Sequence, residues 1–396
     1  MYNVRMNETQ HIYADAPRRN GAGERVALGM SGGVDSSVAA TLLMDEGYEV
    51  LGVTCVFVDT PQAWEAAEDA KAVAERIGIE LVVRDCTELF SREVVCPFVE
   101  TYAAGLTPSP CVGCNVSCKI PSLIDAAEEY GCAFVATGHY ARVVERDGRF
   151  AAAVAADAVK DQSYMLSMLT QAQLSRLLLP LGDIEGGKPQ VRHIAEERGL
   201  PTASKSDSQD ICFIQGSHIP FLEEHGAESV PGDIVNADGV VVGRHEGLIR
   251  YTVGQRKGIG VGGAPEPYYV LEKQSEENRL IVGFAAEARM TSAVVGELNW
   301  QGISGEEFGG LMREEGIPCM VKLRYRQHAV PCSATMHVPD ASCADGMCGM
   351  VLPDEDELTV ILDEPQSLTA PGQYAVLYAG DAVMAAGVIK NVIRVS

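Results

Sequence analysis

The chain is 396 residues long, its formal net charge at pH 7 is −24, and 46% of its residues are hydrophobic. A chain of this length and composition can form two or three globular domains, each with its own core. No apolar run is long enough to span a membrane, and the first two dozen residues lack the apolar stretch of a secretory signal. We therefore expect a cytoplasmic protein with a disordered leader at 1–24 and no membrane partner.

The acidic balance argues against a nucleic-acid partner, because phosphate contacts need Lys and Arg. Net charge does not describe local distribution, however, and basic residues gather within 142–192, 244–257 and 322–326. Twelve cysteines in a cytoplasmic chain argue against a disulfide framework. Most fit the role of small buried hydrophobic residues, but Cys111, Cys114 and Cys118 lie within eight residues and Cys212 follows a polar segment.

Strand-like and helix-like segments alternate through the first half of the chain. Apolar, Val-rich runs predict strands at 25–30, 48–58 and 79–86, and a strand that runs into a polar turn within 132–144. Helical spacing of apolar residues predicts helices at 34–47, 63–78 and 121–131. This alternation predicts a parallel sheet covered on both faces, and the ligands of such sheets bind at the carboxyl ends of the strands.

The second half of the chain has a different pattern of predicted elements. Helices are expected within 167–184 and 188–214, and after residue 216 short strands alternate with Gly-rich and Pro-Gly turns. We therefore predict an α/β domain, a small β-rich central domain and a C-terminal β-barrel, over 25–215, 216–285 and 286–396.

A glycine-rich loop follows the first predicted strand. Its glycines let successive backbone N–H groups turn toward one anion, and the next helix adds its positive end. The loop lacks the Gly-Lys-Ser/Thr ending of P-loops, so it suits the pyrophosphate portion of ATP, with Asp35 as an oxygen ligand for Mg²⁺. The structural alternative is a capped helix after a tight turn. The predicted ATP-binding residues here are Gly29, Met30, Ser31, Gly32, Gly33, Val34, Asp35, Ser36 and Ser37.

The loop "SGGVDSS" resembles the signature of the ATP pyrophosphatase group, whose members release AMP and pyrophosphate as they adenylate a substrate. Further motifs are GLTPSPCVGCN, ATGHYAR, KDQSYML, SDSQDICFI, TVGQRKGIG and RYRQ. In this order and spacing they resemble the bacterial tRNA-specific 2-thiouridylases from Val26 to the C-terminus. The resemblance implies an adenine-nucleotide alpha-hydrolase-like (PP-loop) domain and an enzyme that thiolates the wobble uridine of tRNA.

The implied chemistry begins when AMP is transferred from ATP to the 2-carbonyl oxygen of the uridine, which makes that oxygen a good leaving group. A cysteine persulfide then supplies sulfur, because its outer sulfur is nucleophilic and its S–S bond is weak. The resemblance places the persulfide on Cys212 and a second catalytic cysteine at Cys114, with a disulfide between them afterwards. Asp35 completes the implied catalytic set. A cysteine desulfurase or a persulfide relay protein would be the sulfur donor.

One departure from the family pattern lies beside the second cysteine. Many members have Asn-Pro-Asp there, whereas this chain has Ser109, Pro110 and Cys111. Three thiolates, on Cys111, Cys114 and Cys212, could then hold a [4Fe–4S] cluster with one open iron as an alternative to the persulfide route. A zinc site is disfavoured because the single CxxC pair has no second pair.

A second departure concerns the adenine pocket. Cys55 stands where many relatives have a methionine, so the base would rest on Cys55. Gly138, in the TGHY segment at the end of a predicted strand, would let the chain pass close to the nucleotide. Both residues complete the predicted ATP site.

The resemblance also implies a tRNA surface, and each of its residues has the alternative of an ordinary solvated side chain. Arg can pair with phosphate and Tyr can stack on a base. A basic track on an acidic body would make tRNA binding weaken steeply with salt. No DNA partner is expected. The residues are Ser109, Pro110, Cys111, His139, Lys160, Asp161, Gln162, Arg256, Lys257, Arg324, Tyr325 and Gln373.

Two other functions are compatible with parts of the sequence. The same glycine loop occurs in ligases that adenylate a small substrate, and such an enzyme would form no thiolated nucleoside. A non-catalytic RNA-binding protein whose fold is stabilised by a bound metal would keep its whole function after Cys212→Ser. The intact loop, Asp35 and both cysteines favour the thiolating enzyme.

Overall fold

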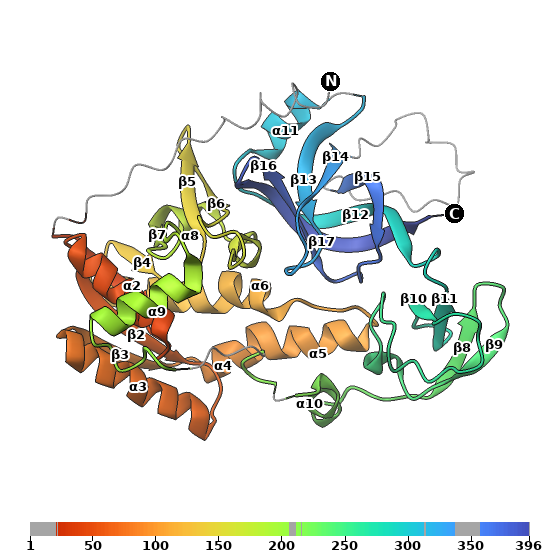
Figure 1. Ribbon diagram of the computed structural model, residues 1–396, viewed down its shortest axis with the longest axis horizontal. Helices are drawn as coiled ribbons and strands as arrows, with labels where there is room; N and C mark the ends of the chain where they lie inside the picture. The colour runs from red at the N-terminus through yellow and green to blue at the C-terminus, as the bar shows by residue number, and fades with distance from the viewer. Residues whose placement is uncertain are drawn as a thin grey trace. The chain divides into compact units, whose positions relative to one another are not determined.

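The computed structural model describes residues 21, 23–205, 211–214, 216–312, 314–336 and 357–395 (Figure 1). Most of the leader predicted at 1–24 lies outside these residues. The chain forms two compact units. Unit 1 contains the chain up to Cys96, Pro110–Gln215 and Ala379–Met384, and unit 2 contains Pro97–Ser109, Gly216–Tyr378 and Ala385–Ser396.

Unit 1 is built on a parallel sheet whose described strands follow the order β3-β2-β1-β4-β7. In the central strand, Val26, Ala27 and Leu28 are fully buried, as a strand covered on both faces requires. The predicted parallel sheet is thereby confirmed. Its strands are β1 (Arg25–Gly29), β2 (Glu49–Val56), β3 (Glu80–Asp85), β4 (Phe134–Ala136) and β7 (Leu177–Leu178).

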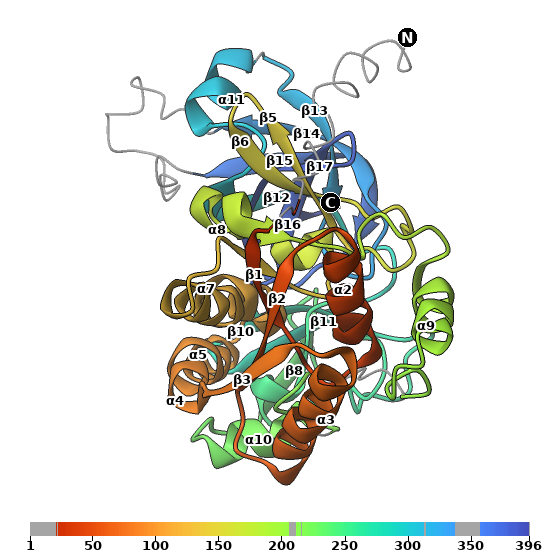
Figure 2. The ribbon, with the colours of Figure 1, turned by 90° about the vertical axis from the view of Figure 1, so that its left-hand side faces the viewer.

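Helices cover both faces of this sheet. Helices α2 and α3 pack on one face and α7 packs on the other (Figure 2). Local sequence fixes the ends of α3, where the Thr60 hydroxyl accepts from the Ala63 N–H at 3.3 Å and Gly78 ends the helix in the left-handed conformation. The helices are α2 (Val34–Asp45), α3 (Pro61–Ile77), α4 (Thr87–Phe90), α6 (Pro110–Cys114), α7 (Ile120–Glu129), α8 (Gln171–Arg176) and α9 (Gly187–Glu197).

Three shorter helical segments and a hairpin complete unit 1. Two of the segments are π-helical turns, η1 (Ser91–Val95) and η2 (Asn115–Lys119), and the third is the 3₁₀ turn η3 (Ser163–Leu166). The hairpin consists of β5 (Arg142–Arg146) and β6 (Arg149–Ala153). π-Helical turns are rare and occur mostly at functional sites, so η1 and η2 indicate a candidate functional region.

Some predicted segments contain short elements. The strand predicted to run into a polar turn within 132–144 ends at Ala136, and the chain leaves the sheet before β5 begins at Arg142. The helices expected within 167–184 and 188–214 correspond to α8 and α9. Leu177 and Leu178 pair with β4 as an edge strand instead, and Pro180 and Pro201 prevent longer helices.

Unit 2 contains two β structures. The first is a sheet in the order β10-β11-β8-β9 over its described strands, in which only β11 and β8 are parallel. Helix α5, helix α10 and the 3₁₀ turn η4 accompany it. These elements are α5 (Cys96–Ala103), α10 (His218–Glu224), β8 (Gly232–Asn236), β9 (Val241–His245), η4 (Leu248–Arg250), β10 (Tyr269–Gln274) and β11 (Arg279–Gly283).

The second β structure of unit 2 is the antiparallel C-terminal barrel. Its strands follow the order β12-β15-β14-β13-β16-β17, and pairing of β12 with β17 closes it. Val295, Ala334, Val360 and Leu377 are fully buried inside. The predicted barrel is therefore confirmed. Its elements are β12 (Arg289–Trp300), α11 (Gly305–Leu311), β13 (Ile317–Lys322), β14 (Val330–Met336), β15 (Leu358–Ser367), β16 (Tyr374–Ala379) and β17 (Ala382–Arg394).

Candidate active site

The glycine loop joins β1 to α2 at the carboxyl end of the sheet, as predicted. Gly33 is the residue before the helix and supplies no side-chain cap, so the first backbone N–H groups of α2 remain suited to an anion. The hydroxyls of Ser36 and Ser37 donate instead to the Gly33 carbonyl, at 3.2 and 2.8 Å. The backbone, rather than these two hydroxyls, therefore offers the donors of the loop. Ser31 is exposed beside it.

Two glycines of the site are required by close packing. Gly32 has φ +67°, and a Cβ there would lie 2.3 Å from the Ala66 carbonyl oxygen. A Cβ on Gly138 would lie 3.0 Å from the backbone of Asp35 and Ser36. The segment after β4 therefore runs directly against the glycine loop, and this close packing by itself requires a glycine at position 138.

Asp35 is held by two side chains that the motif analysis did not assign to the site. The Lys188 ammonium lies 2.7 Å from one carboxylate oxygen, and the Tyr140 hydroxyl donates to the other at 2.5 Å. Lys188 is buried and comes from α9. The positive charge that is missing from the loop sequence is thus supplied by a lysine 153 residues later. In the sequence, the only indication of Lys188 was its position among the basic residues within 142–192.

A cavity of about 330 Å³ lies beside the glycine loop. Thr202 and Lys205 line it, and both also contact the loop. The Thr202 hydroxyl donates to the Ser37 hydroxyl at 3.1 Å, and the Lys205 ammonium donates to the Gly32 carbonyl at 2.9 Å. Lys205 also pairs with Asp69 at 2.5 Å. A second cation therefore stands next to the loop.

The three cysteines predicted to act together lie close enough to affect one another's charge. Cys111 and Cys114 belong to α6, and Cys212 lies on the segment 211–214. Desolvation and the charges of Cys114 and Cys111 raise the pKa of the Cys212 thiol to about 11, and Lys119 opposes this. Desolvation likewise raises the pKa of Cys111. Cys111 and Cys212 remain solvent-exposed, whereas Cys114 is buried.

Aromatic packing ties the Cys212 segment to the carboxyl edge of the sheet. The Phe213 ring lies 5.5 Å from that of Phe90 at the end of α4, and Phe90 lies 5.4 Å from Phe57, which follows β2. Cys212 is thus on the same edge as the glycine loop. Cys55, the residue predicted under the adenine, is half-buried at the end of β2. A hydrogen bond with Cys86 and desolvation raise the pKa of Cys55, so it is a neutral thiol.

His139 lies in the same segment as Gly138. Its Nδ1 is 2.7 Å from the Thr137 hydroxyl. Desolvation lowers the pKa of His139 to about 3, and the charge of Lys119 contributes. The imidazole is therefore neutral at physiological pH and cannot neutralise a phosphate, although it can exchange hydrogen bonds with a base.

The predicted tRNA contacts of unit 1 differ among themselves. Lys160 is exposed, as an RNA contact would be. Asp161 is buried, and its carboxylate accepts from the backbone N–H and the hydroxyl of Ser163 at 3.0 and 2.9 Å. The Gln162 side chain accepts from the Tyr140 N–H at 2.9 Å. Asp161 and Gln162 therefore also stabilise the turn next to the site.

The predicted tRNA contacts of unit 2 lie mainly on turns. Arg256 and Lys257 are exposed on a Gly-rich turn, and exposed Arg324 and half-buried Tyr325 lie between β13 and β14. Gln373 has a further role, since its amide donates to the carbonyls of Thr107 and Pro108 at 2.9 and 3.0 Å. These carbonyls immediately precede Ser109 and Pro110 in the chain. Gln373 therefore stabilises the stretch that leads to α6.

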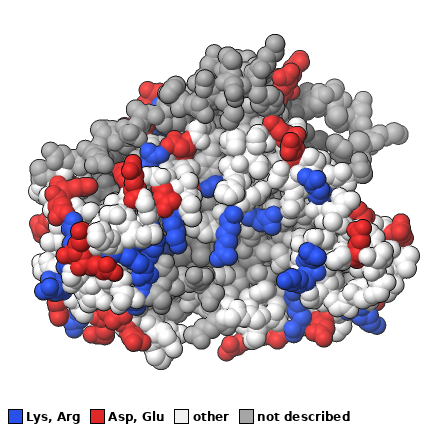
Figure 3. Space-filling view, viewed as in Figure 1, with Lys and Arg blue, Asp and Glu red and all other residues white. Residues whose placement is uncertain are grey.

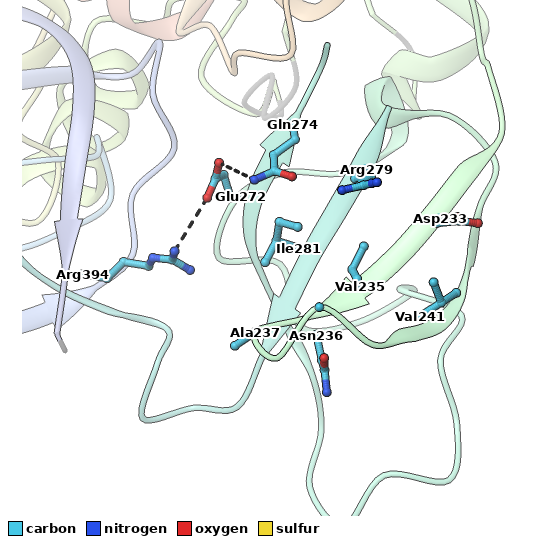
Figure 4. A pocket seen from close by; sticks show the side chains of 11 residues that line it. Asp233, Val235, Asn236, Ala237, Val241, Glu272, Gln274, Arg279, Ile281 and Arg394 are labelled. Atoms are coloured by element: carbon cyan, nitrogen blue, oxygen red, sulfur yellow. Dashed lines mark hydrogen bonds and ion pairs between the residues drawn. The ribbon is translucent and has the colours of Figure 1, made fainter. Parts of the chain in front are cut away.

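The surface charge is mixed. Lys and Arg side chains gather in small groups on the face in Figure 3, several of them beside Asp and Glu. Unit 2 also has a cavity of about 400 Å³ along β8, β10 and β11, where Arg394 pairs with Glu272 at 3.7 Å (Figure 4). No predicted site residue lines this cavity.

Across the ranges that the structure describes, no three Cys, His, Asp or Glu side chains are gathered as metal ligands. No helix in the described part of the chain has the length and apolar character needed to traverse a bilayer.

Comparison with known proteins places the chain in a family. Its residues 24–216 match the model of the tRNA methyl transferase HUP domain, and 219–284 and 340–389 match the tRNA methyl transferase PRC-barrel domain and the aminomethyltransferase beta-barrel domain. The tRNA-specific 2-thiouridylase MnmA of Symbiobacterium thermophilum is 39% identical over 94% of this chain and 93% of that protein. MnmA of Rhizorhabdus wittichii is 41% identical over 93% of this chain and 92% of that protein.

A solved structure, the U34-tRNA thiolase NcsA from Methanococcus maripaludis with its [4Fe–4S] cluster, aligns with 57% of this chain and 70% of that one at 18% identity and a TM-score of 0.34. A likeness of that size transfers neither the activity nor the cluster of NcsA. The full-length identity to the MnmA proteins is decisive for the family. The chain therefore belongs to the tRNA-specific 2-thiouridylases and is a tRNA-uridine 2-sulfurtransferase.

Proposed function

We propose that this enzyme thiolates the wobble uridine of tRNA in two steps at the carboxyl edge of the unit 1 sheet. ATP first transfers AMP to the 2-carbonyl oxygen and releases pyrophosphate, and sulfur from a Cys212 persulfide then replaces that oxygen. One observation carries the proposal. The packing of Phe213 on Phe90, and of Phe90 on Phe57, brings the Cys212 segment to the sheet edge that also holds the glycine loop.

The glycine loop has the properties that pyrophosphate binding requires. The first turn of α2 offers backbone N–H groups with no side-chain cap, and Lys188 and Lys205 place two ammonium groups against the loop. Asp35 could give Mg²⁺ one oxygen ligand if the ion displaced Lys188 from the carboxylate, and Lys188 would then be available to a phosphate. Bound Mg²⁺ would neutralise the charge of the leaving pyrophosphate.

The sulfur step uses both cysteines. The outer sulfur of the Cys212 persulfide attacks C2 of the adenylated uridine, the C2–O bond breaks, and the oxygen leaves with AMP. The Cys114 thiolate then attacks Sγ of Cys212, so that the S–S bond breaks and the outer sulfur stays on C2. This forms a Cys114–Cys212 disulfide, which a thiol reductant reopens for the next cycle. A cysteine desulfurase or a persulfide relay protein is the proposed donor that reloads Cys212.

A [4Fe–4S] cluster on Cys111, Cys114 and Cys212 remains the alternative sulfur carrier. The described residues do not gather these thiols as a metal site, so no step is derived through a cluster. Anaerobic purification with iron and sulfide analysis separates the two routes. Iron-free enzyme with full activity supports the persulfide, and activity that depends on bound iron contradicts it.

The exposed basic residues of the turns fit contacts to tRNA phosphates. Lys160 in unit 1 and Arg256, Lys257 and Arg324 in unit 2 have the exposure that such contacts need. Because the reaction consumes ATP and tRNA, the cytoplasm is the proposed compartment. The domain limits 25–215, 216–285 and 286–396 are proposed as the functional division of the chain.

Mass spectrometry of tRNA nucleosides tests the proposal. Enzyme, ATP, a sulfur donor and unmodified tRNA should yield 2-thiouridine at the wobble position, and Cys114→Ala and Cys212→Ala should each abolish it. Cys96→Ala, which removes an exposed cysteine outside the site, is the matched control and should retain activity. Full activity of Cys212→Ala would contradict the proposed sulfur carrier.

A further inference from the structure

We propose that Cys319 and Cys332 of the barrel are a site of reversible oxidation. They form a disulfide across strands β13 and β14, with a small-molecule disulfide such as oxidised glutathione as the co-reactant. The site is separate from the thiolation chemistry, and none of the sequence motifs includes either cysteine. Disulfides of cytoplasmic proteins are mostly transient, so the proposed bond is one that forms and reopens.

The backbone already has the spacing that a disulfide needs. Strands β13 and β14 are neighbours in the barrel, and their pairing places Cys319 directly opposite Cys332 without a shift of register (Figure 1). Opposite residues of antiparallel strands have Cα atoms about 4.5–5.5 Å apart, and disulfides join Cα atoms about 4.4–6.8 Å apart. Neither strand therefore has to move for the bond to form.

The two sulfur atoms are in contact. The Sγ atoms of Cys319 and Cys332 lie 3.5 Å apart, and the Cys332 thiol is also 3.5 Å from the Cys319 carbonyl oxygen. A disulfide holds its sulfurs about 2.0 Å apart, so they must approach by about 1.5 Å. Small rotations about the Cα–Cβ bonds of the two side chains provide that approach.

Both thiols belong to the face of the hairpin that points into the barrel. Side chains alternate between the two faces of a strand, and Val321 and Ala334, each two residues beyond a cysteine of the pair, are fully buried. Cys332 is buried among them. The disulfide therefore adds no group to the packed interior and requires no side chain to change face.

Cys319 is the thiol that a small molecule can reach. It is half-buried, whereas Cys332 is only 2% exposed. The described pairing of β13 with β16 covers Met320, Val321 and Lys322, so Cys319 lies just past the end of that pairing. We therefore expect the co-reactant to meet Cys319 first.

The oxidation consists of two thiol–disulfide exchange steps. The Cys319 thiolate attacks one sulfur of oxidised glutathione, a mixed disulfide forms, and one glutathione thiolate leaves. Cys332 loses its proton to water and attacks Sγ of Cys319, and the second glutathione leaves. The protein thiols lose two electrons and two protons in total, and the two glutathione molecules take them up as thiols.

The bond fastens the two strands that flank one turn of unit 2. That turn carries Arg324 and Tyr325, so oxidation acts on part of the predicted tRNA surface, and this consequence alone rests on the proposed function. Amide hydrogen exchange in the paired residues of β13 and β14 should slow by about tenfold or more, because a disulfide that closes a loop of this length restricts the opened hairpin. Unchanged exchange in the oxidised protein would contradict the fastening.

Peptide mapping of the full-length protein tests the disulfide itself. The protein is equilibrated with oxidised and reduced glutathione at several ratios, its free thiols are blocked, and it is digested with trypsin and with a protease that cleaves before Asp. Cleavage in the turn and before Asp340 and Asp345 puts every cysteine of the barrel sequence on its own peptide. These cysteines are Cys319, Cys332, Cys343 and Cys348.

The expected product is a linked pair of peptides that contains Cys319 and Cys332. It should exceed every other link of either cysteine by at least about tenfold, because thiols held in contact react at a high effective concentration. A dithiol reductant should remove it. Absence of this link at every glutathione ratio overturns the inference, and so does a preferred link from Cys319 to Cys343 or Cys348.

Two variants test the order of the steps. Cys332→Ala should leave Cys319 carrying glutathione, because the second thiol is missing, and Cys319→Ala should leave Cys332 unmodified. Cys132→Ala removes a buried cysteine of unit 1 and is the control, which should keep the Cys319–Cys332 link. Glutathione found on Cys332 in Cys319→Ala would overturn the proposed order. Because tRNA and ATP are absent, a failure of the proposed thiolation would appear separately, as absent 2-thiouridine with a normal peptide map.

Discussion

The ion pair between Asp35 and Lys188 should contribute measurably to the stability of unit 1. It joins the first turn of α2 to the first turn of α9, and the side chains are 32% and 10% exposed. Breaking a fully buried pair costs about 3–5 kcal/mol, and exposed pairs contribute about 0.2–1 kcal/mol. Since Asp35 is one-third exposed, solvent screens part of the attraction, and we expect a coupling energy of about 1–2 kcal/mol.

A double-mutant cycle with Asp35→Asn and Lys188→Met measures that energy by urea unfolding. In a Trp300→Phe background the fluorescence of Trp64, on α3, reports on unit 1.

The same two helices provide the matched control for this cycle. Arg198 and Asp45 join the other ends of α9 and α2 at 2.6 Å, with 33% and 60% exposure. Their coupling should be about 0.2–1 kcal/mol. If the Asp35–Lys188 coupling is no larger than this, the pair is a surface contact and the reasoning from its burial is refuted.

Three further changes test other parts of the structure. Gly138→Ala should lower the free energy of unfolding by about 1–3 kcal/mol and weaken ATP binding, measured by calorimetry, roughly tenfold, because the added Cβ would press on the backbone of the glycine loop. Gly262→Ala is the control and should change neither quantity, because a Cβ there would have no atom within 4 Å. Gln373→Leu removes two hydrogen bonds to the carbonyls before α6 and should lower the thiolation rate in a single-turnover assay, and an unchanged rate would remove that positioning role. Burial lowers the pKa of Lys273 to about 8, so the unfolded chain binds the extra proton above that pH. Urea unfolding of unit 2 should therefore show stability rising as pH increases above about 8, and Lys273→Met should abolish the rise.

The parts of the site that were predictable are those whose chemistry is local in sequence. A strand, glycines and a helix in succession indicate where an anion binds, because all the donors belong to one short segment. The family motifs indicated Cys114 and Cys212. The sheet and the barrel followed from apolar patterns, which determine which faces are buried.

The parts that escaped prediction depend on distant segments meeting. Lys188 reaches Asp35 across 153 residues, and no local pattern identifies such a pair. Asp161 was predicted as a tRNA contact, with a solvated surface side chain as the alternative. Its carboxylate is buried because it accepts a backbone N–H group within a tight turn. The π-helical turn Asn115–Lys119 also escaped prediction, because a tertiary contact of Asn115 supports it and helical periodicity does not indicate it.

Oxygen-isotope transfer tests the central claim most directly. tRNA carrying ¹⁸O at the 2-carbonyl of the wobble uridine is incubated with the enzyme, ATP and a sulfur donor, and AMP is analysed by mass spectrometry. If ATP activates that oxygen as a leaving group, the label appears in AMP in proportion to the 2-thiouridine formed. Label found in water, with unlabelled AMP, would contradict adenylation of the uridine.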